Sequence, residues 1–320
     1  MSLSGAALRE FLGTVIIALV ATFAIHVLFF FSPQDLRVAG DLNNCYDVKA
    51  DLRRSPEPGV APQIDGWAEI RLLFTSYGGW LTCLASGSLG TSLYSGDSVG
   101  KMVAGALPAT LGLLVLGIAA SSLLSLALGW RLATSRGGGW RLLSGGLSTL
   151  SLVPVYLLAF TVRGAFLRSM EDVSGPERIL SGALEIAVLA VLLAVANGIY
   201  AESVETVANV IRRETGEPYV RSLISRRISV IRHVLRGTSP VLIGLSASQI
   251  PRLVTAVFIL EFAFNKRGLG WEALRAFREA RSDVPVVLGI TLAAVLVVRL
   301  LLGIQRVSIA WLNPRLGSAT

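Results

Sequence analysis

Six apolar runs divide the sequence, and each is long enough to cross a lipid bilayer as a helix. A membrane-spanning helix needs about 20 mainly apolar residues, and helical backbone satisfies its own hydrogen bonds in the absence of water. These runs therefore predict an all-α membrane protein with six transmembrane helices. The predicted spans are 11–31, 104–130, 142–162, 182–200, 241–262 and 284–311.

The composition agrees with a membrane protein and excludes an ordinary soluble enzyme. Hydrophobic residues make up 53% of the chain and charged residues only 16%, against about 25% charged residues in soluble domains. The first run ends in "FFFSPQD" without a small-residue cleavage site, so we interpret it as a retained helix rather than a signal peptide. Two cysteines and two histidines are too few for a cysteine-based metal cluster.

Basic residues indicate the orientation of the chain, because lysines and arginines near the ends of spans mark the cytoplasmic side. The loop 131–141 holds three arginines and no acid, and the segment 201–240 is also rich in arginine. Both fall on the same side as the two termini, which are therefore predicted to be cytoplasmic. The loop 263–283 is an exception, since it carries five basic residues on the opposite side. The net charge of +8 then reflects topology, and we expect no nucleic-acid partner.

Three separated stretches resemble one protein family. They read "YGGWLTCLASGSLGTSLYSGDSVGKMVAGALPATLGLLV" at 77–115, "GEPYVRSLISRRISVIRHVLRGTSPV" at 216–241 and "VFILEFAFNKRGLGWEALRAFREARSDVPVVLG" at 257–289. In this order they are similar to the membrane permease subunit of oligopeptide and dipeptide ABC importers, whose relatives also carry nickel chelates and glutathione. Ser88 stands at the usual aspartate position of the first motif. The residues that match this motif are Gly87, Leu89, Gly90, Ser92, Ser95, Gly96, Val99 and 107–111.

The resemblance implies a type I ABC importer permease fold with an extracytoplasmic insertion after the first helix. The expected divisions are an N-terminal transmembrane helix at 1–31, an extracytoplasmic segment at 32–101 and a five-helix core at 102–320 with a cytoplasmic coupling loop at 201–240. The chain would form half of the pathway for peptides or similar small solutes in the bacterial inner membrane. The implied partners are a second homologous permease subunit, ABC ATPase subunits, an extracytoplasmic solute-binding protein and the lipid bilayer.

The second stretch resembles the coupling helix, which such permeases present to a groove on the ATPase. Over 217–236 the resemblance assigns an ATPase-contacting helix; its candidate residues are Glu217, Tyr219, Val220, Arg221, Arg226 and Arg227. Glu217 and Pro218 suit a helix N-terminus. The family loop continues with a glycine that turns the chain, whereas this loop is shorter and lacks it. We therefore expect either one continuous helix or a different break, with a remodelled or lost ATPase contact. Alternatively, the arginines only hold topology and bind lipid headgroups.

No catalytic motif is visible in this chain. The sequence "SGDSVGK" at 95–101 fails as a phosphate-binding loop, because Ser95 replaces the first glycine and Met102 replaces the required serine or threonine. The chain is therefore not expected to be an enzyme or to bind a cofactor. ATP and Mg²⁺ are expected in the partner ATPase.

Polar residues within the fifth predicted span are the candidates for the translocation pathway. Arg252 is the most unusual, because charged groups at membrane depth are costly and often functional. Its guanidinium would suit a carboxylate or phosphate of a solute. The structural alternative is an ion pair, with Glu185 or with a partner chain. Gln249 is a second pathway candidate.

The extracytoplasmic segment holds both cysteines. Since bacterial exteriors oxidise thiols, we hypothesise a disulfide between Cys45 and Cys83. The stretch 67–81 is amphipathic and is expected to lie on the membrane surface or beneath a docked binding protein.

Two other classes of function compete with the importer permease. A scaffold or regulatory membrane subunit that has lost transport would agree with the shortened coupling loop. An ion-gradient transporter should show inverted repeats and intramembrane acids, and the sequence offers little of either.

Overall fold

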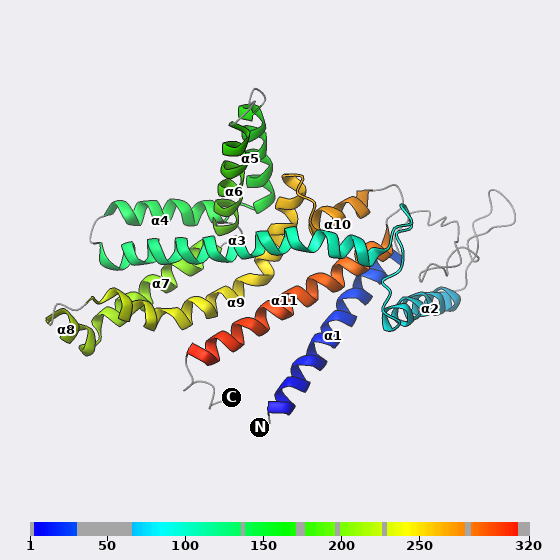
Figure 1. Cartoon of the computed structure of the whole chain (residues 1–320), viewed down its shortest axis with the longest axis horizontal. Helices are drawn as coiled ribbons and strands as arrows, with labels where there is room; N and C mark the ends of the chain where they lie inside the picture. The colour runs from blue at the N-terminus through cyan, green and yellow to red at the C-terminus, as the bar shows by residue number, and fades with distance from the viewer. Residues whose placement is uncertain are drawn as a thin grey trace. The chain divides into compact units, whose positions relative to one another are not determined.

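The computed structural model describes residues 3–30, 66–135, 138–170, 177–195, 199–225, 229–278 and 283–312, and these are almost entirely helical. Outside the helices, the described residues form one isolated β-bridge, between Thr91 and Ser98. Figure 1 labels the helices along the chain. They are α1 (Leu3–Phe30), α2 (Gly66–Ala85), α3 (Val99–Thr134), α4 (Gly138–Ser151), α5 (Val155–Met170), α6 (Glu177–Val195), α7 (Ile199–Gly216), α8 (Pro218–Ser225), α9 (Ile231–Ala263), α10 (Leu269–Arg278) and α11 (Val284–Leu312).

Four described helices are long and apolar enough to cross a membrane, and the number rises to six if each of two bent helix pairs is one span. The all-α membrane fold is thus confirmed. The four long candidates are Arg9–Phe30, Val99–Thr134, Ile231–Ala263 and Val284–Leu312, which correspond to the first, second, fifth and sixth predicted spans.

The third and fourth predicted spans are the two bent pairs. In the third, α4 and α5 meet at 102°. The break falls at Pro154, because a proline disfavours helical geometry in the residue before it and offers no N–H of its own. In the fourth, α6 and α7 meet at 73° across 196–198, which lie outside the described residues. Runs of apolar residues revealed that these segments are helical but not that they bend.

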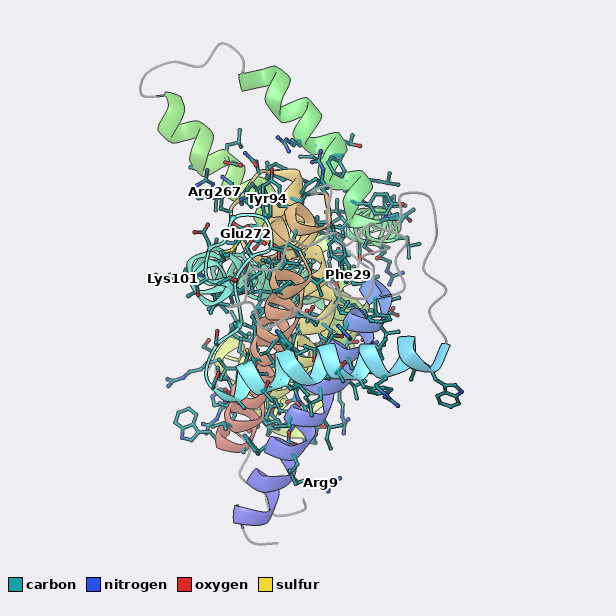
Figure 2. All side chains as sticks on the ribbon, turned by 90° about the vertical axis from the view of Figure 1, so that its right-hand side faces the viewer. Arg9, Phe29, Tyr94, Lys101, Arg267 and Glu272 are labelled. Carbon is teal, nitrogen blue, oxygen red and sulfur yellow. The ribbon has the colours of Figure 1, made fainter. Side chains whose placement is uncertain are left out.

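The chain divides into two compact units, and the first consists of Met1–Pro108 and Arg267–Val297. Here α2 crosses α1 (Figure 2). The Tyr77 hydroxyl donates to the Leu19 carbonyl at 3.0 Å and lies 2.8 Å from the Thr22 hydroxyl. One turn further along α1, the buried His26 places Nε2 3.1 Å from the Ser76 hydroxyl. The amphipathic segment predicted for the membrane surface therefore packs against residues of the first predicted span.

The second unit consists of Ala109–Lys266 and Val298–Thr320. Its core includes a cluster of Val207, Ile211 and Val234, packed against side chains of α3 and α9. Helix α3 approaches α7 closely at Gly129, where an added Cβ would lie 2.8 Å from a methyl carbon of Val207. Glycine is required at this crossing because no side chain fits between the two helices.

Replacement of Gly129 by alanine should destabilise the protein by about 1–3 kcal/mol, because the new methyl group overpacks a stiff β-branched neighbour. The measurement is the free energy of unfolding in detergent. The matched control is Gly112→Ala in the same helix, where an added Cβ meets nothing within 4 Å. That variant should be stabilised by up to about 1 kcal/mol through helix propensity. Equal effects at both glycines would contradict the close α3–α7 contact.

Candidate functional site

The first family-like motif forms a tight loop between α2 and α3, and its glycines have backbone roles. Gly87, Gly90 and Gly96 have φ angles of 85°, 84° and 74°, a region that residues with a Cβ seldom enter. The Ser92 hydroxyl accepts backbone N–H groups of Tyr94 at 3.2 Å and Ser95 at 3.0 Å. These conformations explain why glycine and serine occur at this spacing in the motif.

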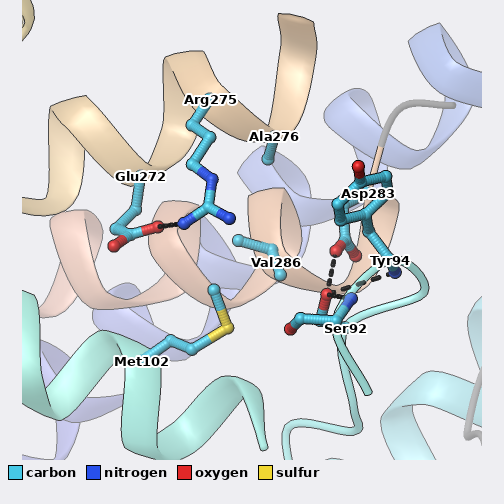
Figure 3. A pocket seen from close by; sticks show the side chains of 9 residues that line it. Ser92, Tyr94, Met102, Glu272, Arg275, Ala276, Asp283 and Val286 are labelled. Atoms are coloured by element: carbon cyan, nitrogen blue, oxygen red, sulfur yellow. Dashed lines mark hydrogen bonds and ion pairs between the residues drawn. The ribbon is translucent and has the colours of Figure 1, made fainter. Parts of the chain in front are cut away.

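The third family-like motif is bonded to this loop through Asp283, which precedes α11 and is 2% exposed. Its carboxylate accepts the Ser92 hydroxyl at 2.5 Å (Figure 3), and it also accepts the Leu93 backbone N–H at 3.2 Å. Further along α11, an added Cβ on Gly289 would lie 2.6 Å from a methyl carbon of Val99. Two motifs that lie far apart in the sequence thus form one contact within the first unit.

A small cavity lies beside this contact and is lined by residues of the same loop, α3, α10 and α11 (Figure 3). Arg275 and Glu272 lie on one of its walls and form an ion pair at 3.9 Å. The Arg275 guanidinium also lies 5.5 Å from the centre of the Trp271 ring. The cavity volume of about 10 Å³ holds no more than one water molecule. The site is therefore a structural junction rather than a solute pocket.

The second family-like motif begins at the end of α7. The Val220 N–H donates to the Glu217 carbonyl at 3.1 Å, so α8 starts at Pro218, as the sequence predicted. Val220 is fully buried, whereas Tyr219 is 45% exposed. The Tyr219 hydroxyl donates to the Glu214 carboxylate at 2.7 Å. This hydrogen bond raises the pKa of Tyr219 to about 12, with smaller contributions from burial and from the charges of Glu214 and Glu217.

Of the two expectations for 217–236, one continuous helix or a different break, the structure has the break, because two helices lie there. Helix α8 ends at Ser225 and α9 begins at Ile231. A break therefore exists without the family's glycine. Arg221 lies in α8 but its side chain is not among those described, and Arg226 and Arg227 lie outside the described residues. Their predicted ATPase contacts stay predictions.

Both pathway candidates contact α7, one turn apart on α9. The Gln249 amide is buried and donates to the Ser203 hydroxyl. Arg252 forms an ion pair with Glu202 at 2.8 Å, and the two side chains are 46% and 43% exposed. The structural alternative for Arg252 was correct in kind but named the wrong acid. Glu185 instead pairs with Lys266 at 2.7 Å.

The sequence interpretation missed the acidic partner because it placed Glu202 beyond the fourth span. The ion pair puts Glu202 beside the middle of the fifth predicted span, so α7 packs along that span. It also missed the bond from the Gln305 amide to the Ser246 hydroxyl at 2.6 Å. The spacing of Ser246, Gln249 and Arg252 could have indicated a polar contact face on this helix, since positions three residues apart share one face of a helix.

The predicted disulfide between Cys45 and Cys83 stays a prediction, because Cys45 lies outside the described residues. Within those residues, no group of three or more histidine, cysteine or acidic side chains is arranged to hold a metal ion.

Comparison with known proteins agrees with this architecture. No family model matches the chain. The chain is 26% identical over 250 residues to the metal-staphylopine import system permease protein CntB of Staphylococcus aureus, in strain Mu50 / ATCC 700699 and in strain NCTC 8325 / PS 47. The match covers 76% of this chain and 78% of each relative.

The helical membrane fold and this match are both consistent with a permease subunit of a binding-protein-dependent ABC importer, of the oligopeptide and dipeptide type. It is a multi-pass membrane protein. The resemblance of the three motifs agrees with this match, while their individual residues are assigned no function by the comparison.

The junction of the first and third motifs should be energetically coupled. Asp283→Ala should cost about 1.5–3 kcal/mol, because it removes hydrogen bonds to a buried charged group. Ser92→Ala should cost less, and the double variant should cost less than the sum of the two singles. The measurement is a double-mutant cycle on the free energy of unfolding in detergent. Asp97→Ala, at an exposed acid of the same loop, should have little effect. Additive single effects would show that the contact does not join the motifs.

Proposed function

We propose that this chain forms one half of the translocation pathway of an ATP-driven importer, opposite a second homologous permease subunit. It lies in the bacterial inner membrane with both termini in the cytoplasm. ABC ATPase subunits, which bind ATP and Mg²⁺, dock on the cytoplasmic side, and a solute-binding protein delivers solute on the other side. The chain itself binds no cofactor. The observation that supports this proposal most is α8, a separate helix of eight residues at the position of the family's coupling helix.

The proposed cargo is a small charged solute. The resemblance suggests peptides, whereas the curated relatives are named for the import of metal-staphylopine. We therefore propose peptides or metal complexes of similar size as the substrate class. Of the two predicted pathway residues, the half-exposed Arg252 suits a solute contact. The buried Gln249 suits a structural role, since its amide bonds α9 to α7.

The burial of α8 suggests how coupling works. Val220 is buried against this chain and fixes the helix to it. Tyr219 is half-exposed and therefore available to the groove of an ATPase. A scaffold subunit that has lost coupling remains the second candidate function. The loop that contains α8 is shorter than the coupling loop of the family, which favours this second candidate.

Copurification with an ATPase subunit tests the coupling proposal. Tyr219→Ala combined with Glu217→Ala should weaken ATPase binding about 30-fold, because truncation of an interface anchor costs about 2 kcal/mol or more. In liposomes, solute-stimulated ATP hydrolysis by the double variant should fall as the ATPase binds more weakly. The control is Tyr94→Ala, which removes a tyrosine exposed to 66% in the loop before α3. Unchanged stimulation in the double variant would exclude α8 as the coupling element, and the absence of any ATPase partner would favour the scaffold.

A further inference from the structure

Helix α9 differs from the other long helices in the residues that it exposes. Between 232 and 263, all described, no large apolar side chain is exposed. By contrast, α1 exposes Phe11, Ile16 and Val20, as a helix does when lipid covers it. The exposed positions of α9 in the fifth predicted span are small or polar. They are Gly244, Ser248, Pro251, Arg252 and Thr255.

These positions form one face, because their spacing of three, four, seven and eight residues keeps them on the same side of a helix. The neighbouring α7 exposes a face of the same character, which begins with Glu202, Glu205 and Asn209. Lipid tails offer such a surface no hydrogen bonds. The open side of α7 and α9 is therefore built to meet something more polar than lipid.

The ion pair lies at the centre of this surface. Arg252 follows the start of the fifth predicted span, at Val241, by 11 positions, or about 16 Å at the helical rise of 1.5 Å per residue. Charged side chains at such depth usually face a bundle interior or a water-filled cavity. The hydrogen bond between Gln249 and Ser203, one turn away, fixes the register of the two helices. The backbones that carry the pair are thus held firmly while about half of each charged side chain remains open.

We propose that Glu202 and Arg252 form a paired contact for zwitterionic solutes in the translocation pathway. Arg252 takes the carboxylate of the solute and Glu202 takes its cationic group. This inference rests on the proposed importer function and assigns a residue, Glu202, that the sequence motifs do not include.

The chemistry favours solutes that carry both charges. Without solute, the two residues neutralise one another across 2.8 Å. When a zwitterion binds, its carboxylate replaces Glu202 as the partner of Arg252, and its cationic group replaces Arg252 as the partner of Glu202. No charge is therefore left unpaired. A solute with a single charge would leave either Glu202 or Arg252 without a counter-charge, which is unfavourable away from bulk water.

Thiol labelling tests whether the surface is lined by water, and it does not depend on transport. In the intact complex, Ser248→Cys and Thr255→Cys should react with a membrane-impermeant maleimide, in a background where Cys45 and Cys83 are replaced by serine. Leu123→Cys, at an exposed apolar position of α3, should not react. Protection of both cysteines in the assembled complex would show that lipid or the second permease covers this face, and would overturn the proposal.

Uptake of radiolabelled dialanine into liposomes that contain the complex and ATP tests the solute contact. Glu202→Gln and Arg252→Gln should each reduce uptake about tenfold, the effect of losing about 1.4 kcal/mol of interaction. The double variant should be at least as impaired. If the pair only held α7 to α9, the double variant would recover, because no charge would remain unpaired. Recovery would therefore overturn the proposal. The control is Glu185→Gln combined with Lys266→Met, which removes a different ion pair of the same unit and should leave uptake unchanged.

A second probe separates the two charges of the solute. Dialanine amide keeps the cation and lacks the carboxylate, so the ratio of dialanine to dialanine amide uptake should fall in Arg252→Gln. The preference of the binding protein cancels when this ratio is compared between variant and wild type. An unchanged ratio would overturn the assignment of Arg252 to the carboxylate. If the wild-type complex transports no probe while the cysteines still react, the proposed peptide import fails rather than the water-lined surface.

Discussion

The constraint that organises this protein is that polar side chains on membrane-spanning helices must find partners within the protein. Thr22 and His26 on α1 find theirs on α2, at Tyr77 and Ser76. On α9, Gln249 bonds to α7 in the same way. Because lipid supplies no hydrogen bonds, each polar contact specifies which helices pack together and in which register. Apolar packing alone is less selective, since lipid tails compete equally well for an apolar side chain.

Glycines and short polar links complete this specification where helices or loops approach most closely. Gly289 allows α11 to pack against Val99, and the Asp283 carboxylate holds the Ser92 loop just before α11 begins. The two motifs that resemble the importer family are therefore explained by mutual packing. Their spacing in the sequence reflects a single structural joint rather than a binding site. This explains why the resemblance of these motifs to known permeases does not point to the solute.

The sequence predicted what depends on local pattern and missed what depends on contacts between distant segments. Long apolar runs identified the helices, and Pro218 marked the start of α8. The bend at Pro154 divided a run that looked continuous by composition. The partner of Arg252 could not be inferred, because Glu185 and Glu202 were both acids near the fourth span. Only the packing of α7 on α9 distinguishes them.

The contacts around α8 connect the candidate coupling helix to the helix that carries Arg252. The Tyr219 hydroxyl of α8 bonds to Glu214 of α7, and an added Cβ on Gly237 of α9 would lie 2.6 Å from that carboxylate. Gly237 precedes Arg252 by 15 residues, about 22 Å along the helix. Between them Pro240 and Pro251 each remove one helical hydrogen bond. A displacement of α8 must therefore either break its contact with Glu214 or move α7 and α9 as well. In α9, bending is easiest at the two prolines, because a helical hydrogen bond is missing at each of them. Pro251 weakens the helical turn that holds Gln249 and adjoins Arg252, so such bending would act on both contacts of α9 with α7.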